Sequence, residues 1–279
     1  MFGQFPVLLT TRLYIIATVI LGVVLAFPQQ VRAQAKGKVS YLILGGTVEP
    51  LMITKPDDPM AGGIITEIMK HIFSNSAYQI VPKVMPWKRM VEELRTGDNW
   101  ISYGFPEGNE PGIPLEFSKS PVMEFNHVAI TLRSNHFKIE HVSDVAGRVA
   151  ILVENFHYPG LDQHLDKPLV GTGGGAIKTI RAFSPKGTLR MLQHKRGDVV
   201  FGFHARMLYN LRETELPLKE FRFQDASRII PSQPLYLTMS SQQPPEVKQL
   251  VNDGLKRLAA DGTLKRILQK YSGPEDLVE

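Results

Sequence analysis

The spacing of apolar positions along the chain changes between the period of a strand and that of a helix, and it predicts alternating elements. Residues 38–44 are rich in aromatic and branched side chains and read as a first strand. After the glycine pair at 62–63, isoleucine and methionine recur on one stripe, which predicts an amphipathic helix. A second strand is expected over 79–84. With the helix and strand that follow, the order is β-α-β-α-β, which indicates an open sheet covered by helices.

One stretch of the chain, residues 94–105, is nearly repeated at residues 193–203. In both copies an amphipathic helix ends in basic residues and a glycine, Gly97 or Gly197, which is the usual signal for a helix stop. An apolar strand follows at once in each copy. The distance from Gly-Asp to Gly-Phe differs by two residues, so the same side chains keep the same strand face. The repeat predicts two similar α/β lobes with a ligand-binding cleft between them.

The second half of the chain shows the same alternation. A strand is expected over 128–132, a turn or helix cap at 143–144, and a short, fully apolar strand over 148–153. The glycine-rich segment 171–175 reads as a loop. After the second copy of the repeat, residues 205–213 continue as a helix. These elements are expected to build the second lobe.

The end of the chain is expected to return to the first lobe. A strand over 234–239 precedes a long amphipathic helical tail, which is interrupted at 261–262. Such a helix needs a partner surface, and the first sheet has the fewest helices of its own. The chain then crosses between lobes near 121–124 and near 230–234, which makes a hinge. The expected boundaries are residues 36–124 with 235–279 for the first lobe, and residues 125–234 for the second.

The first 33 residues have the features of a secretory signal peptide. Arg12 precedes a mostly apolar run over 13–27, and small-residue cleavage patterns follow at Val31-Arg32-Ala33 and at 33–35. The alternative is an uncleaved membrane anchor, but the apolar run is shorter than the ~20 residues that a membrane-spanning helix needs. We therefore expect an exported chain that begins near Gln34 or Lys36.

Composition narrows the class and the location of the protein. The chain has 279 residues, of which 43% are hydrophobic, enough to bury one or two cores. It contains no cysteine, which excludes disulfides, a thiolate metal site and an acylated N-terminal cysteine. An exported protein without a lipid anchor is best confined in the periplasm of a two-membrane bacterium, with free secretion as the alternative.

The net charge of +5 does not indicate a nucleic-acid partner. Without Arg12 and Arg32, 30 basic residues face 27 acidic ones, and no run of five like charges occurs. A solvated, mildly basic surface is the better interpretation, and we expect a monomer that binds no nucleic acid.

Several local patterns that can signal chemistry are incomplete. The segment 171–176 fits the loose dinucleotide pattern G-x-G-x-x-G/A, but it lacks a convincing preceding strand, and it fails as a P-loop because Ile177 replaces a required glycine. The histidines lack the i, i+4 spacing of metal ligands on a helix, and no G-x-S-x-G elbow occurs. The sequence therefore predicts no cofactor, no metal and no catalytic residue.

Several strings occur in an order that resembles one known family. They are Gly62-Gly63 with its helix, Pro86-Trp87-Lys88-Arg89, Gly97-Asp98, Phe117-Ser118-Lys119-Ser120-Pro121, Ser143-Asp144-Val145-Ala146-Gly147-Arg148, Arg196-Gly197-Asp198, and the tail from Leu255 to Tyr271. The chain resembles the family 3 extracellular solute-binding proteins, type II periplasmic binding proteins best known for amino-acid uptake with ABC transporters. The resemblance implies an α/β fold of two lobes, each an open mixed sheet flanked by helices, joined by a double-crossover hinge.

Two departures from this family pattern bear on the ligand. Members that bind free amino acids typically carry an arginine shortly before the Phe-Ser string, to pair with the ligand carboxylate. This chain has no arginine over 108–113. Those members also carry an aspartate for the ligand ammonium five residues after the second Gly-Asp, where this chain has Phe203. A standard amino-acid ligand is therefore not expected.

The family pattern implies a cleft with aromatic walls and one or two cations. Such walls suit a partly apolar or ring-bearing ligand that can be anionic. For Phe105 and Phe203 a packing role remains open, and Arg89 can equally be a helix N-terminal salt-bridge partner. The expected ligand-binding residues are Glu49, Trp87, Arg89, Tyr103, Phe105, Glu154, Asn155, Tyr158, Phe203 and Arg206.

The sequence thus predicts a periplasmic protein whose two lobes close on a small ligand. It is expected to deliver the ligand to an ABC-type permease and to catalyse no reaction. Two alternatives stay open. One is a sensing module for a membrane receptor, because that role needs the same hinge. The other is a dehydratase-like enzyme on the same fold, for which Glu49 and Glu154 are the candidate acids or bases.

Overall fold

The computed structural model describes residues 37–46, 48–107, 111–154, 156–167, 176–273 and 278. All of them belong to one compact unit of the chain, residues 36–279. The predicted signal peptide and the glycine-rich segment 171–175 lie outside the described residues. Within the part of the chain that is described, no helix combines the length and the apolar character needed to cross a bilayer.

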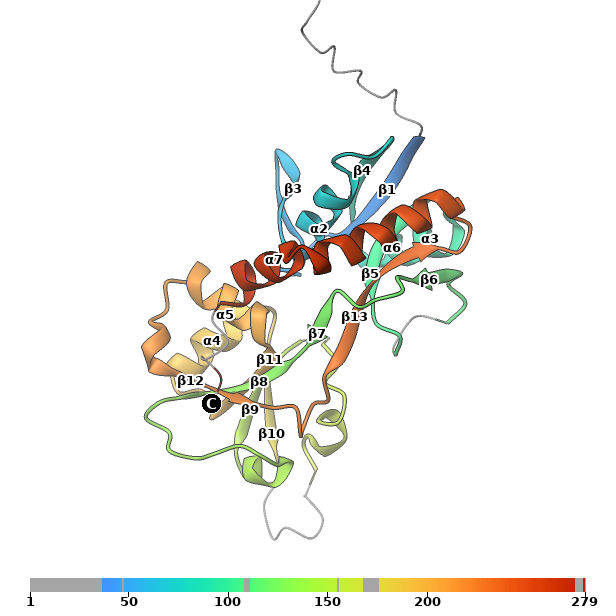
Figure 1. The fold of residues 1–279 in the computed structure, drawn as a ribbon. Coiled ribbons are helices and arrows are strands. Elements are labelled where there is room, and N and C mark those ends of the chain that lie inside the picture. The colour runs from blue at the N-terminus through green and yellow to red at the C-terminus, as the bar shows by residue number, and fades with distance from the viewer. Residues whose placement is uncertain are drawn as a thin grey trace, which may run out of the picture. The chain divides into compact units, whose positions relative to one another are not determined.

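The first sheet has the strand order β4-β1-β5-β13-β6, with β7 paired to β13 (Figure 1). Strand β1 is parallel to β4 and β5, whereas β13 is antiparallel to β5 and β6. The branched and aromatic side chains of β1 that predicted a strand, Tyr41 to Ile43, are fully buried. The strands are β1 (Gly37–Leu44), β4 (Tyr78–Met85), β5 (Trp100–Gly104), β6 (Leu115–Phe117), β7 (Met123–Phe125) and β13 (Gln233–Ser240).

Four helices accompany this sheet: α2 (Ile64–Phe73), α3 (Trp87–Thr96), α6 (Pro245–Ala260) and α7 (Thr263–Ser272). The whole apolar stripe that predicted α2 is buried. Helices α6 and α7 pack against α2, as the sequence predicts for the tail, and their buried face joins the same core as the stripe of α2. The break between them falls at Asp261 and Gly262.

The second sheet has the order β10-β9-β11-β8-β12. Its three parallel strands lie side by side, and β8 is antiparallel to both β11 and β12. Ser184 caps α4 by accepting a hydrogen bond from the Gly187 N–H, and a proline follows at the first helical position. The elements are β8 (His127–Leu132), β9 (Val149–Val153), β10 (Lys178–Ala182), β11 (Val199–Phe203), β12 (Phe221–Asp225), α4 (Pro185–Gln193) and α5 (His204–Glu213).

The chain passes between the two sheets next to a pair of antiparallel strands. Strand β7 pairs antiparallel with the start of β13, Phe125 opposite Gln233, and Figure 1 shows the two strands side by side between the sheets. Near the chain end, Val278 forms a parallel bridge with Phe223 of β12. Val278 therefore contacts the second sheet, although the buried face of α7 belongs to the core of the first.

Some elements were not predicted from the sequence. A small hairpin of β2 (Ile53–Lys55) and β3 (Asp58–Gly62) lies in the segment that reads as a Pro/Asp-rich loop. Strands β10 and β12 were also missed, because only part of each is buried and their polar residues interrupt the apolar pattern. Neighbouring strands supply the missing support, since β10 pairs with β9 and β12 pairs with β8.

Both helices end at or shortly before the repeat glycine, as predicted, with Gly97 as the C-cap of α3, but neither glycine has the left-handed conformation of a glycine helix stop. Gly97 has φ −79°, an ordinary conformation for any residue, and in the second copy Lys195, not Gly197, has a left-handed φ of 54°. Both glycines are instead required by close packing. A Cβ at Gly97 would lie 2.6 Å from the Glu93 carbonyl oxygen, and one at Gly197 would lie 2.6 Å from Ile151. The repeat therefore preserves the space around each helix end.

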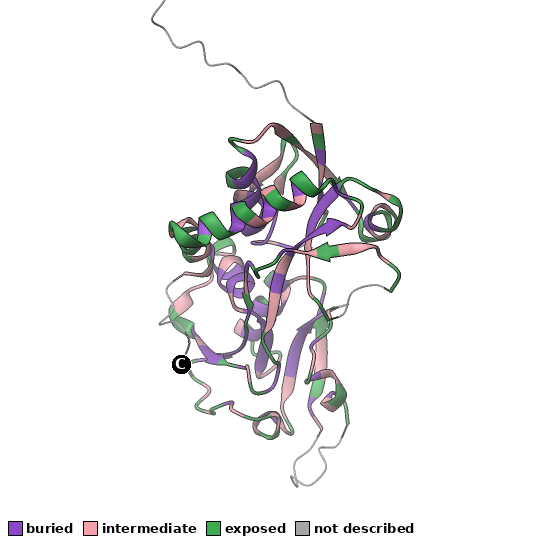
Figure 2. Cartoon of the chain, turned by 45° about the vertical axis from the view of Figure 1, so that its right-hand side comes forward, coloured by how far each residue is buried: buried purple, intermediate pink, exposed green. Residues whose placement is uncertain are grey.

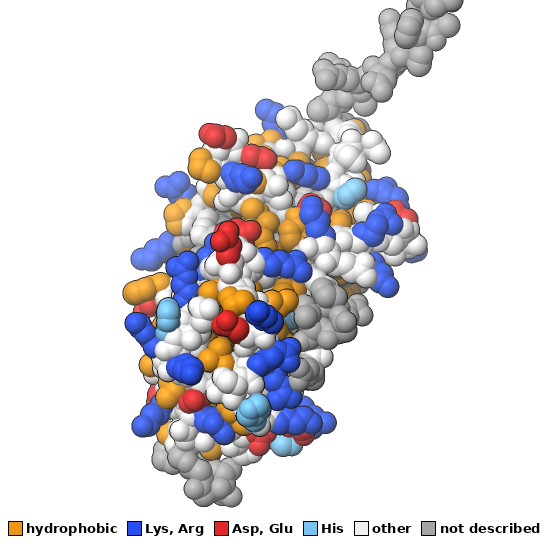
Figure 3. Space-filling view, turned by 90° about the vertical axis from the view of Figure 1, so that its left-hand side faces the viewer, with side chains coloured by type: hydrophobic (Ala, Val, Ile, Leu, Met, Phe, Trp, Pro, Cys, Tyr) orange, Lys and Arg blue, Asp and Glu red, His pale blue; other side chains and the backbone are white. Residues whose placement is uncertain are grey.

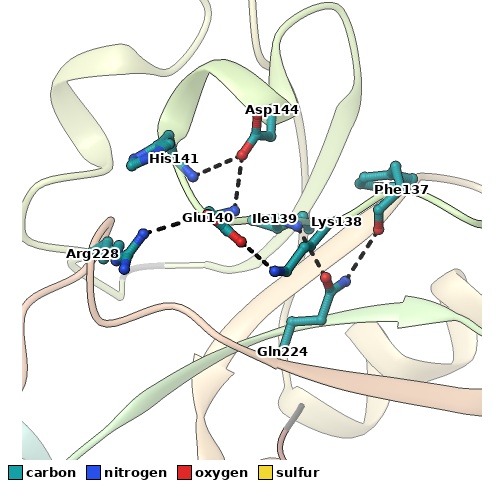
Figure 4. Close-up of polar contacts among 8 residues, drawn as sticks. All are labelled: Phe137, Lys138, Ile139, Glu140, His141, Asp144, Gln224 and Arg228. Atoms are coloured by element: carbon teal, nitrogen blue, oxygen red, sulfur yellow. Dashed lines mark hydrogen bonds and ion pairs between the residues drawn. The ribbon is translucent and has the colours of Figure 1, made fainter.

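A long connection between β8 and β9 is held by side-chain hydrogen bonds (Figure 4). Gln224 of β12 accepts from the Ile139 N–H at 3.0 Å and donates to the Phe137 carbonyl at 3.5 Å. Asp144, in the short 3₁₀ helix Val142–Val145, accepts from two backbone N–H groups, those of Glu140 and His141. The turn predicted at Ser143-Asp144 is thus a 3₁₀ helix whose acidic side chain caps it.

Buried residues are concentrated in the sheets, whereas charged side chains are spread over the surface. Figure 2 shows the buried residues concentrated along the strands and the inner faces of the helices, while α6 exposes its outer face. On the face drawn in Figure 3, lysine and arginine side chains are spread widely, with acidic side chains among them. This distribution agrees with the solvated, mildly basic surface inferred from the composition.

Candidate functional site

The carboxyl ends of the parallel strands place aromatic side chains from both sheets in contact. In open α/β sheets, ligands bind beyond these strand ends. Phe105 follows the end of β5, and Phe203 is the last residue of β11. The Phe125 ring, at the end of β7, stacks on the Phe203 ring at 3.7 Å and meets the Phe105 ring edge-on at 5.0 Å. The ends of the two sheets therefore share one aromatic cluster.

The loop after β9 adds two more rings to this region. The rings of Phe156 and Tyr158 meet edge-on with their centres 5.0 Å apart. Tyr158 is fully buried, and its hydroxyl accepts a hydrogen bond from the Val153 N–H at 3.0 Å. Burial raises the pKa of Tyr158 to about 12, so its hydroxyl keeps its proton at neutral pH.

One cation lies against these rings. Arg206 is in the first turn of α5, immediately after β11, and only 9% of its surface is exposed. Its guanidinium carbon lies 5.5 Å from the centre of the Phe156 ring, within the range of a cation–π contact. Burial lowers the pKa of Arg206, while Tyr103, Tyr158 and Glu49 act in the opposite direction. Because a guanidinium is so strongly basic, Arg206 remains charged at neutral pH despite this lowering.

A pocket of about 440 Å³ opens beside the aromatic cluster. It is large enough for a small organic molecule. Its wall combines rings with a few polar groups. The lining residues are Phe105, Glu107, Phe125, His127, Phe156, His157, Pro159 and Gln233.

A second, more apolar pocket of about 210 Å³ lies on the first sheet. It is bounded by the start of α3 and the end of β5, and Phe105 borders both pockets. Trp87, half of whose surface is exposed, lies on its rim with Tyr103. The remaining lining residues include Leu44, Met90, Leu94, Ile113, Leu115 and Thr238.

The structure brings several of the residues predicted from the sequence together. Tyr103, Tyr158 and Glu49 lie close enough to Arg206 to affect its pKa, and Phe105 and Phe203 both contact Phe125. Trp87 shares the smaller pocket with Tyr103 and Phe105. Phe203 is 2% exposed and stacked, so a packing contact accounts for its ring in this structure.

Two predicted residues lie away from these pockets. Arg89 and Glu154 are exposed, and neither borders the two pockets formed by the described residues. Glu154 uses its backbone N–H to bond the Ala182 carbonyl at the end of β10. Asn155 lies outside the described residues.

Of the residues that line the larger pocket, only Phe105 was predicted from the sequence, and Phe125, His127 and Phe156 are among those that were missed. Phe125 and His127 come directly after the first expected crossing, where the sequence indicates a backbone hinge but no ligand-binding side chain. Phe156 follows the predicted Glu154-Asn155 pair by one residue. An aromatic residue next to each predicted crossing or strand end was the signal that could have found them.

The described residues offer no metal centre, because no three His, Asp or Glu side chains among them lie close enough to hold a metal ion. The larger pocket can instead surround an apolar or aromatic body, with the His127 imidazole in its wall and the buried Arg206 guanidinium behind the Phe156 ring.

The fold has two mixed β-sheets flanked by helices, and the chain passes between them at paired antiparallel strands. This arrangement defines the two-lobed, periplasmic-binding-protein-like class of fold. Residues 42–274 match the model of the bacterial extracellular solute-binding proteins, family 3. The chain belongs to this family.

Known proteins similar to this chain include binding and sensing proteins. The probable amino-acid-binding protein YxeM of Bacillus subtilis (strain 168) is 22% identical over 250 residues, covering 88% of this chain and 89% of that protein. A histidine kinase sensor domain with similarity to periplasmic binding proteins is 17% identical with a TM-score of 0.61, covering 87% of this chain and 98% of that one. A structure from work on glutathione import through GshT and the cystine ABC importer TcyBC of Streptococcus mutans is 18% identical with a TM-score of 0.63, covering 85% and 95%.

Proposed function

We propose that the protein is a periplasmic solute-binding protein that captures a small, partly aromatic or apolar ligand between two hinged lobes and does no chemistry on it. The observation that carries this proposal is the pocket of about 440 Å³ whose walls come from the strand ends of both sheets. A ligand that touches both walls binds best when the lobes are closed, so binding shifts the hinge toward closure.

The proposed lobes are residues 36–124 with 235–279, and residues 125–234. Membership of the two sheets supports this division, because β1 to β6 and β13 share one sheet or its hairpin, while β8 to β12 share the other. The paired strands β7 and β13 are the proposed hinge. The bridge between Val278 and Phe223 adds a further contact across the division near the chain end.

The proposed ligand-binding residues are those predicted from the sequence. Among them, Phe105 borders both pockets, and Trp87 and Tyr103 border the smaller one. Arg206 lies against Phe156, which belongs to the wall of the larger pocket. Phe203 supports the view that the ligand is not a standard amino acid. It is buried and stacked on Phe125, and it carries no charge to pair with a ligand ammonium group. The walls are mainly rings, which favour a flat or apolar ligand body.

Two roles are candidates for the ligand-bound protein. The proposed partner is the permease of an ABC-type importer. The family's proteins bind solutes, and one of the similar structures comes from work on glutathione import through GshT and an ABC importer. A sensing module for a membrane receptor is the second candidate, and the similarity to 98% of a histidine kinase sensor domain favours it. Uptake of labelled ligand by cells that lack the protein distinguishes the two, because only an importer component is needed for uptake.

The experiment that tests ligand capture uses the full chain, expressed with its own N-terminal segment and purified from the periplasm. Small molecules that co-purify are identified by mass spectrometry, and a metabolite panel is screened by thermal shift. We expect at least one small molecule to raise the melting temperature. No stabilising small molecule in either experiment would contradict the proposed function.

A matched pair of variants locates the binding. Phe156→Ala removes a ring from the pocket wall and is expected to abolish the shift. Phe183→Ala removes a ring that is 88% exposed and does not border the pocket, and it is expected to leave the shift unchanged. Turnover of the stabilising molecule that disappears in Glu154→Gln or Glu49→Gln would favour the dehydratase-like alternative.

A further inference from the structure

His127 is a buried polar side chain without a hydrogen-bond partner among the described residues. It is the first residue of β8 and is 3% exposed. Both of its ring nitrogens are buried, and neither makes a hydrogen bond within the described chain. Buried polar groups are nearly always hydrogen-bonded in folded proteins, and an exception therefore calls for an explanation.

Strand pairing shows on which face of the sheet the His127 ring lies. His127 pairs directly with Phe203 across β8 and β11, so the two side chains lie on the same face. Its ring centre is 5.4 Å from that of Phe125 and 6.5 Å from those of both Phe156 and Tyr158. His127 is thus a buried polar residue within the wall of the larger pocket.

The imidazole is neutral at physiological pH. Burial, followed by the charge of Arg206, lowers the pKa of His127 to about 4. A neutral imidazole has one N–H that donates and one nitrogen that accepts a hydrogen bond. In this pocket it can therefore bond a ligand oxygen without bringing a second full charge into the site.

The charges around His127 favour an anionic group over a cationic one. The Arg206 guanidinium is buried against the Phe156 ring, whose centre is 6.5 Å from that of the His127 ring, and its charge contributes to lowering the pKa of His127. The carboxylate that borders the pocket, Glu107, is exposed on its rim, and Glu49 is half-buried on the side of Arg206. A carboxylate beside His127 meets a buried cation and an N–H donor, whereas an ammonium group there meets a like charge.

We propose that His127 binds the ligand directly, donating its ring N–H to a carboxylate of a small aromatic or apolar acid that has no amino group, with Arg206 supplying the opposite charge. The proposal rests on the proposed function and names its ligand class. His127, from β8 of the second sheet, and Arg206, from α5, together hold the carboxylate of the ligand. The rings of Phe105, Phe125 and Phe156 hold its apolar or aromatic body.

Three probes with the same phenyl body separate the possible charges: 3-phenylpropionate, L-phenylalanine and phenethylamine. Their binding to the full chain, stripped of bound molecules by unfolding and refolding, is measured by calorimetry. We expect 3-phenylpropionate to bind, L-phenylalanine to bind at least about 10-fold more weakly, and phenethylamine not to bind detectably. Equal or tighter binding of either amine, or no binding of 3-phenylpropionate, overturns the assigned ligand class.

Two histidine variants test the residue. His127→Phe keeps a ring but removes both nitrogens, and it is expected to weaken 3-phenylpropionate binding at least about 10-fold without lowering the melting temperature of the free protein. The matched control is His204→Phe, because His204 also has a buried Nε2 without a partner in the described chain but packs against Phe223 instead of bordering this pocket. It is expected to leave the affinity unchanged.

The outcomes also separate this inference from the proposed function. Unchanged affinity in His127→Phe overturns the role of the histidine, even if Phe156→Ala still abolishes binding and ligand capture stands. A lower melting temperature in His127→Phe with unchanged affinity assigns the residue a packing role and likewise overturns the proposal. If no compound of the metabolite panel or the three probes binds, the proposed function fails together with the inference.

Discussion

Tyr271 connects the last helix of the chain to the first helix of the described fold. Its hydroxyl accepts a hydrogen bond from the Gly63 N–H at 2.8 Å and donates to the Glu67 carboxylate. The Lys270 ammonium donates to the same carboxylate at 2.6 Å. One phenol group therefore satisfies the start of α2 and orders the end of α7, more than two hundred residues away.

Replacing Tyr271 by phenylalanine is expected to lower the free energy of unfolding by about 1–3 kcal/mol, because the buried Gly63 N–H loses its partner. Urea denaturation measures the change. Tyr236→Phe is the control, since its half-buried hydroxyl makes no hydrogen bond within the described residues. Equal losses in the two variants would show that the Tyr271 hydroxyl contributes nothing specific.

Glu67 also predicts a pH dependence of stability. Burial raises the pKa of this carboxyl, but the hydrogen bonds from Lys270 and Tyr271 outweigh burial and hold the pKa below its usual value of 4.5. The unfolded chain therefore takes up the proton first as the pH falls. The stabilisation is complete above about pH 4.5 and is lost as the pH falls through the lowered pKa of the folded state.

The test compares the acid sensitivity of wild type with that of Glu67→Gln, whose side chain cannot ionise. Melting temperatures measured from about pH 6 down to about pH 3 are expected to fall more steeply in wild type. Other carboxylates affect both proteins alike, so the difference between the two slopes reports Glu67. Parallel slopes would mean that its pKa is the same in the folded and unfolded chains.

At the scale of elements, the two copies of the helix–strand repeat use their glycines in a way that the pattern did not indicate. The second helix, α4, ends at Gln193, Lys195 then takes the left-handed conformation, and Gly197 passes close to Ile151 of β9. The glycine is needed where the helix end meets the sheet, and the left-handed position two residues earlier holds a lysine.

This difference predicts opposite results for two nearby substitutions. Gly197→Ala is expected to destabilise the fold by about 1–3 kcal/mol, because the new methyl group overlaps Ile151. Lys195→Gly is expected to stay within about 1 kcal/mol of wild type or to be more stable, since glycine adopts a left-handed φ without strain. Denaturant midpoints measure both. A larger loss in Lys195→Gly than in Gly197→Ala would contradict this account of the repeat.

For the whole molecule, the hinge is the feature that links the fold to the proposed capture of a ligand. The described strands β7 and β13 are the paired segments between the two sheets, and rings from both sheets meet beside them. Motion about these strands would separate the walls of the larger pocket and bring them together again. The absence of cysteine from the sequence makes this motion accessible to site-directed spin labelling.

Labels at Lys186→Cys and Lys256→Cys report on the two lobes, because Lys186 is exposed on α4 and Lys256 is exposed on α6. Adding 3-phenylpropionate is expected to shift the distance between them by several ångströms, as the lobes close. The control pair is Glu92→Cys with Lys256→Cys, which lie on α3 and α6 of the same proposed lobe and should keep their distance. An unchanged first pair at saturating ligand would argue for binding without closure.

Much of the fold could be predicted from the sequence, because local periodicity records which side of each element is buried. The stripe of α2, the strand β1 and the broken tail of α6 and α7 all follow from it. The strands β10 and β12 did not, since their stability depends on neighbours far away in the chain. Likewise, the family pattern implied Arg206 as a ligand-binding residue, but its burial against Phe156 depends on how α5 lies against the loop after β9.

The sequence by itself determined the family, the two-sheet architecture and the places where the chain crosses, because apolar spacing and short ordered motifs are properties of neighbouring residues. Only the tertiary structure decided which side chains form the pocket. Phe125, His127 and Phe156 come together through strand register and loop path, which join residues that no local pattern connects. The same packing leaves the His127 nitrogens buried without a partner in the described chain, and that is the property from which its proposed role follows.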